Sequence, residues 1–224
     1  MLEARERIVH SQDWVTIILL MVIALIVYAK LTNNERFYRL QSLFFNTSYI
    51  SEYSKTTPLL INVFNVVFYI ISVLTISLTI IVIIQKINPE TNEITIGFYF
   101  KTVVLVFLFT TVRYFVGALL GVLFENEKEQ KYFSFLKLSY LSFLSLIITP
   151  LLIINFYSQS ATFTSIFIVI TLLLVGFSYF LIFKNNPSFI FKRMFYFILY
   201  LCALEIAPLL IIYKLIVSQG TFKI

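Results

Sequence analysis

The sequence contains few of the residues from which catalytic and metal sites are built. Its 224 residues include one cysteine, Cys202, one histidine, His10, and one aspartate, Asp13. A single cysteine excludes an intrachain disulfide and a cysteine-based metal site. A single histidine argues against zinc proteases, which need paired histidines, and against serine hydrolases, whose nucleophile needs a histidine beside it. A single aspartate argues against enzymes that hold Mg²⁺ on aspartate clusters.

Glycine and charged residues are scarce as well. Five glycines provide no phosphate-cradling loop, and no dinucleotide-binding or C-x-x-C motif is present. We therefore expect no catalytic residues, no bound cofactor and no metal site. Charged residues make up only 12% of the chain and hydrophobic residues 60%, whereas a soluble domain has about 25% and about 45–50%. With a mean hydropathy of +0.94, the composition predicts an integral membrane protein.

Six apolar runs predict an all-α bundle of about six transmembrane helices in one polytopic domain, residues 1–224, because about 20 apolar residues cross a bilayer as helix. The expected spans are 14–28, 59–84, 98–124, 133–157, 162–183 and 194–217. Only four residues separate the fourth run from the fifth, so these two helices should be antiparallel neighbours. The first run is expected to be a retained anchor, because the segment before it is charge-balanced and no small-residue cleavage site follows.

The basic residues predict the orientation. One side of the membrane collects ten: Lys30, Arg36, Arg39, Lys55, Lys128, Lys131, Lys137, Lys184, Lys192 and Arg193. The other collects six: Arg5, Arg7, Lys86, Lys101, Lys214 and Lys223. The positive-inside rule makes the first side cytoplasmic, with both termini on the opposite side. The same distribution accounts for the net charge of +6 without a nucleic-acid partner.

The longest connection contains a short amphipathic stretch at residues 35–46. Phe37, Leu40 and Phe44 repeat every three to four residues, with Arg36 and Arg39 between them. This pattern is typical of a helix that lies in the interface on anionic lipid. The alternative is a loop that packs on the bundle.

Two ionisable residues fall deep inside the spans. Arg113 lies eleven residues before the end of the third run, and Glu205 lies eleven residues after the start of the sixth. Both are therefore expected about 17 Å from the cytoplasmic ends of their helices. Because a buried charge normally finds a partner, we expect an Arg113–Glu205 pair. It would either lock two helices together or let Glu205 take part in proton or ion coupling; snorkelling, or pairing with another subunit, is the other interpretation.

Small and polar residues mark the expected packing faces. Gly117 and Gly121 form a small-xxx-small motif on the face of Arg113, which suits close packing in the bundle or dimerisation. Polar stripes follow the second and fourth runs: Asn62, Asn65, Tyr69, Ser72 and Thr79, and Ser139, Ser142, Ser145 and Thr149. They indicate interhelical hydrogen bonds or, alternatively, a polar path. Pro150 and Pro208 are expected to kink their helices.

Residues 200–214 of the last span, and the segment from 112–117 to 150–152, resemble a family of small polytopic membrane proteins from Bacteroidota. That family is a domain of unknown function. The resemblance implies a bacterial inner-membrane location, and hence periplasmic termini, but no activity. It singles out Arg113, Glu205 and Pro208 for testing.

Three functions are compatible with these features. The first is a non-catalytic subunit or scaffold of a membrane assembly, with the lipid bilayer and either other membrane subunits or further copies of the chain as partners. The second is a small carrier or channel that uses Arg113 and Glu205. The third, which rests only on interfacial basic and aromatic residues, is a lipid-handling enzyme.

Overall fold

The computed structural model describes residues 13–44, 46, 48–54, 62–87, 95–123, 125, 127–158 and 160–185. The sixth predicted span, with Glu205 and Pro208, lies outside these residues. Within them the chain forms helices and no strands. The helices are α1 (Asp13–Thr32), α2 (Asn34–Gln41), α3 (Ser48–Tyr53), α4 (Val63–Ile87), α5 (Ile96–Leu123), α6 (Glu127–Ser158) and α7 (Ala161–Asn185).

Five of these helices, α1, α4, α5, α6 and α7, are long and apolar enough to cross a membrane. They occupy the stretches in which the first five spans were expected. The structure therefore confirms the predicted fold class, an all-α membrane bundle. No lipid is needed to form the backbone hydrogen bonds, because each helix satisfies them within itself.

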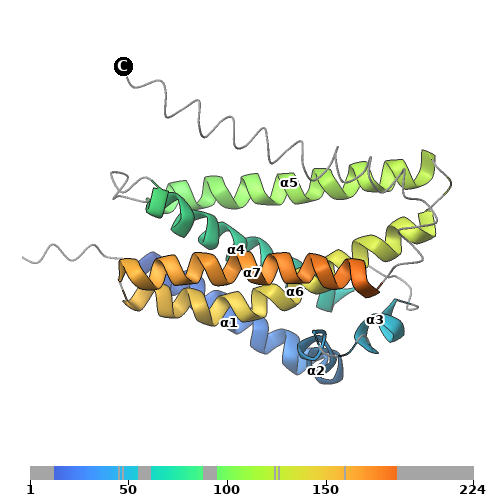
Figure 1. Ribbon diagram of the computed structural model, residues 1–224, viewed down its shortest axis with the longest axis horizontal. Coiled ribbons are helices and arrows are strands. Elements are labelled where there is room, and N and C mark those ends of the chain that lie inside the picture. Colours follow the sequence, from blue (N-terminus) through green and yellow to red (C-terminus); the bar gives the residue numbers. More distant parts are fainter. Residues whose placement is uncertain are drawn as a thin grey trace, which may run out of the picture.

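The helices α4 and α6 form the centre of the described bundle. In their most apolar stretches 56% of the residues are buried, compared with 28% for α1 and for α7 and 11% for α5. Figure 1 shows α5 along one flank of the bundle, and the short helices α2 and α3 together at one end. Of the five described membrane helices, α5 is thus the one whose apolar surface is least covered by the rest of the described chain.

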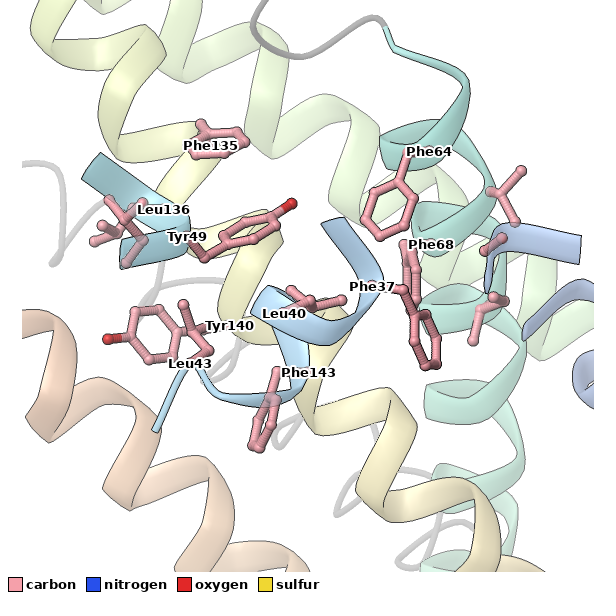
Figure 2. Close-up of a cluster of buried hydrophobic side chains, with 14 of the residues drawn as sticks. Phe37, Leu40, Leu43, Tyr49, Phe64, Phe68, Phe135, Leu136, Tyr140 and Phe143 are labelled. Carbon is pink, nitrogen blue, oxygen red and sulfur yellow. The ribbon is translucent and has the colours of Figure 1, made fainter. Parts of the chain in front are cut away.

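A cluster of buried aromatic and aliphatic side chains fixes α2 and α3 against this end of the bundle (Figure 2). Phe37 and Leu40 of α2 are 4% and 0% exposed, and Phe37 lies against Phe68 of α4 with ring centroids 6.3 Å apart. Tyr49 of α3 stacks on Phe135 of α6 at 6.0 Å. Burial of such side chains contributes about 1.5–3 kcal/mol each.

This packing changes the interpretation of the amphipathic stretch. Its first part is the helix α2, but the apolar face of that helix contacts protein and not lipid. The two alternatives drawn from the sequence are thus each half right: the segment is helical, and it packs on the bundle. The periodicity that defines an apolar face does not say whether protein or lipid covers it.

Pro150 lies inside α6, and Gly121 of α5 lies against the start of α6. The helix α6 continues from Glu127 to Ser158 through Pro150, so this proline does not end it. Gly121 of α5 is buried beside the first turns of α6. A Cβ atom added there would lie 3.0 Å from the Cβ atom of Gln130 and 3.6 Å from the Cα atom of Glu127. Glycine therefore permits the close approach of α5 and α6.

We expect Gly121→Val to destabilise the protein by about 1–3 kcal/mol, because the added methyl groups would force α5 away from α6. Gly176→Val in α7 is the control, since a Cβ atom there meets nothing within 4 Å. Unfolding of both variants in detergent checks this. Equal stability of the two would contradict the close approach at Gly121.

Candidate functional site

The structure places Arg113 on α5, where it is half-buried, with Gly117 buried one turn further along. Because Glu205 lies outside the described residues, the Arg113–Glu205 pair remains a prediction. The two glycines share the side of α5 that faces into the bundle, and Gly121 contacts the start of α6. At Gly121 the motif therefore serves packing within one chain.

The polar stripe of α4 is divided among several neighbours. Asn62 caps the helix, since its Oδ1 atom accepts from the backbone N–H of Phe64 at 3.2 Å. Tyr69 points to α5, with its Oη atom 2.7 Å from Oγ1 of Thr110. Ser72 points to α6, where Oγ of Ser145 lies 2.9 Å away. These side chains therefore do not line a common path.

The stripe of α6 is buried and satisfied within the bundle. Each of its hydroxyls lies 2.7–2.9 Å from the carbonyl oxygen four residues earlier in the same helix. The members are Ser139, Ser142, Ser145 and Thr149, all at most 4% exposed. On α4, Ser72 and Thr79 hydrogen-bond backward in the same way. This arrangement is that of a packing seam, in which hydroxyl groups need no water.

The most unusual polar group in the described part of the chain is Arg36 of α2. Its side chain is buried, with 5% of the residue exposed. Nε donates a hydrogen bond to Oη of Tyr49 at 3.2 Å, and Nη2 donates to Oδ1 of Asn65 at 2.9 Å. These contacts connect α2 to both α3 and α4. An ion pair with a carboxylate, which is the usual partner of a buried arginine, is not found for Arg36 among the described residues.

Aromatic rings take the place of that carboxylate. The guanidinium carbon lies 4.7 Å from the ring centroid of Tyr53, 4.8 Å from that of Phe64 and 5.8 Å from that of Tyr49. The negative face of an aromatic ring attracts a cation, by about 2 kcal/mol or more where water is excluded. Tyr49 and Phe64 also belong to the cluster in Figure 2. The cation is thus held by the same side chains that attach α2 to the bundle.

The charge of Arg36 also affects Tyr49. Burial raises the pKa of the Tyr49 phenol above its usual value of 10.0. The positive charge of Arg36 and hydrogen bonds with Arg36 and Ser139 act in the opposite direction and offset part of this rise. Tyr49 is therefore neutral at physiological pH, and its oxygen acts as a hydrogen-bond acceptor for the arginine.

A pocket of about 510 Å³ opens beside Arg36, where the end of α1, the start of α2, the end of α3 and the residue before α4 meet. Its polar lining comprises Thr32, Asn33, Asn34, Glu35, Arg36, Tyr53 and Asn62. A buried cation at the wall of a polar pocket is an arrangement that binds anions. We take this pocket as the candidate site.

Sequence reasoning missed this site. It treated Arg36 as one of several interfacial cations, because arginine between apolar positions is typical of a solvated helix face. The partners Tyr49 and Asn65 lie 13 and 29 residues away in the sequence. The sequence does contain several tyrosine, phenylalanine and asparagine residues around positions 49–65. Their spacing, however, follows no pattern that identifies a binding site for a cation.

The chain belongs to a family described as a domain of unknown function (DUF4271), whose model matches residues 15–216. This finding confirms the resemblance to an uncharacterised family. No curated protein and no solved structure matches the chain significantly.

We expect a coupling free energy of about 1.5–3 kcal/mol between Arg36 and Asn65, because hydrogen bonds to a charged group are among the stronger ones. A double-mutant cycle of Arg36→Gln and Asn65→Ala measures it by unfolding in detergent. The control pair is Arg39 and Glu52, whose ion pair joins α2 to α3 at the surface and should couple by at most about 1 kcal/mol. Equal couplings would contradict the buried role of Arg36.

Proposed function

We propose that this member of the DUF4271 family is a non-catalytic subunit or scaffold of an assembly in the bacterial cytoplasmic membrane. The observation that carries the proposal is the contrast between the interior of the bundle and its flank. The hydroxyl groups buried between α4 and α6 are satisfied within the bundle. The apolar flank of α5, by comparison, is left uncovered by the described chain.

The shape of that flank favours a helix as its occupant. A hollow of about 510 Å³ lies beside α5, and the described residues that line it are Gly97, Phe100, Lys101, Val104, Leu105 and Leu108. Its lining is almost wholly apolar. Helices associate in membranes by fitting side chains into such hollows beside small residues. A transmembrane helix of another subunit is the proposed partner.

The described basic residues support the proposed orientation. Those at the end of the bundle where α2 lies are Lys30, Arg36, Arg39, Lys128, Lys131, Lys137 and Lys184. At the other end are Lys86 and Lys101. This asymmetry favours a cytoplasmic position for α2 and α3 and a periplasmic N-terminus. The periplasmic C-terminus depends on the sixth predicted span.

A photocrosslinking amino acid at Leu108 of α5 tests the proposal in native membranes. We expect it to give one stoichiometric adduct with another membrane protein, which also co-purifies with the tagged chain after gentle solubilisation. Leu173 of α7 is the control position, because it is similarly exposed, at 67% against 54%, but lies on another helix. A crosslink only to residues 194–217 of the same chain, together with purification of the protein alone, would overturn the proposal.

A carrier is the second candidate, and the position of Arg113 favours it. This residue lies inside an apolar span, where an ionisable side chain is costly and often belongs to a proton or ion pathway. If the protein carries protons, Glu205→Gln should abolish proton flux into proteoliposomes loaded with a pH-sensitive dye under an imposed potential. Glu129→Gln, at the exposed start of α6, is the control. No flux with the wild-type protein would exclude this candidate.

A further inference from the structure

We propose that the pocket beside Arg36 binds a phosphate group, either that of a phospholipid headgroup or that of a soluble phosphorylated compound. The inference rests on Arg36, on the start of α2 and on the position of the pocket at the end of the bundle. It is independent of the subunit proposal, because it concerns a different end of the molecule and a different partner.

The guanidinium of Arg36 has one nitrogen donor that no described residue uses. Nε and Nη2 bind Tyr49 and Asn65, whereas no partner of Nη1 is found among the described residues. Arg36 lines the pocket although only 5% of the residue is exposed. Its orientation is fixed by two hydrogen bonds and three rings, so little entropy is lost when an oxyanion binds. A planar guanidinium is well suited to phosphate oxygens.

Backbone N–H donors at the start of α2 lie beside the same pocket. The first hydrogen bond within α2 runs from the N–H of Phe37 to the carbonyl oxygen of Asn33. The N–H groups of Asn34, Glu35 and Arg36 precede it, and Asn33 makes no side-chain cap hydrogen bond to them. These N–H groups and the positive end of the helix dipole favour an anion here. Asn62 adds amide donors, because its oxygen already caps α4.

One group opposes an anion. The exposed carboxylate of Glu35 also lines the pocket, and its negative charge repels phosphate across the opening. This repulsion allows two variants that act in opposite directions and keep Arg36 in place. Glu35→Gln should strengthen phosphate binding, and Asn34→Asp should weaken it. Asn34→Asp also places an acid at a helix start, which favours folding.

The pocket lies beside apolar surface. Leu31 at the end of α1 lines it and is 78% exposed, and Val27 and Tyr28 on the turn before are also exposed. Lys30 lies above the ring of Tyr38, with Nζ 5.8 Å from its centroid. A headgroup in the pocket could therefore extend its acyl chains along α1. A soluble phosphate compound would use the polar lining alone.

Native mass spectrometry of the full-length protein in detergent tests the proposal with dioleoyl-phosphatidylglycerol as the lipid probe and glycerol phosphate as the soluble probe. We expect Arg36→Gln and Asn34→Asp to weaken binding at least about tenfold, which corresponds to about 1.4 kcal/mol. Glu35→Gln should strengthen it. Gln41→Glu, which adds the same charge as Asn34→Asp at the other end of α2, should leave it unchanged.

Retention of the lipid alone would identify a headgroup site, and retention of glycerol phosphate would identify a site for soluble compounds. Either result supports the proposal if the variants act as expected. Binding of neither probe would overturn it. So would lipid binding that Asn34→Asp, Glu35→Gln and Gln41→Glu leave equally unchanged, since it would then lie elsewhere. The three variants decide the question even if Arg36→Gln fails to fold.

Discussion

The satisfaction of polar groups without water is the constraint on which the rest of this structure depends. In a bilayer each unsatisfied donor or acceptor costs several kcal/mol, so a partner inside the protein stabilises a buried hydroxyl. Among the described residues only a few buried polar atoms, such as Tyr99 Oη and Thr171 Oγ1, have no such partner. The serines and threonines of α4 and α6 find theirs in backbone carbonyls one turn back and in one another, as Ser72 and Ser145 do. Small side chains satisfied in this way let the two central helices approach closely. The remaining helices pack around that centre.

Arg36 satisfies the same constraint by other means. Removing a guanidinium from water is costly, and a carboxylate partner would itself need desolvation. Three aromatic rings and two neutral oxygens avoid that second cost, since they stabilise the cation without adding a buried anion. The charge is consequently held but not neutralised by its described neighbours. An arginine of this kind attaches α2 to the bundle and also lines the pocket, opposite in charge to the exposed Glu35.

The sequence was sufficient for the fold class and for the five apolar helices, because hydropathy over about 20 residues follows directly from the thickness of the bilayer. It was sufficient to find the residues of the polar stripes, but not their partners. Residues on one stripe of α4 contact α2, α5 and α6 in turn, since the helix crosses its neighbours at different heights. Arg36 escaped detection because its contacts depend on how the two short helices α2 and α3 pack against α4. Periodicity describes a face and does not identify what covers it.

The two buried or half-buried arginines show how the same residue type is used in different surroundings. Arg36 lies at one end of the bundle, where aromatic rings and a polar pocket surround it. Arg113 lies among apolar residues of α5, the helix with the least buried surface. At the end of the bundle a guanidinium remains within reach of headgroups and water, so it can serve binding. Within the apolar span it requires a partner at its own depth, and the equal depth of Glu205 in the sequence makes that residue the natural choice. The two roles proposed here, binding for Arg36 and helix pairing for Arg113, therefore follow from position relative to the membrane and not from residue type.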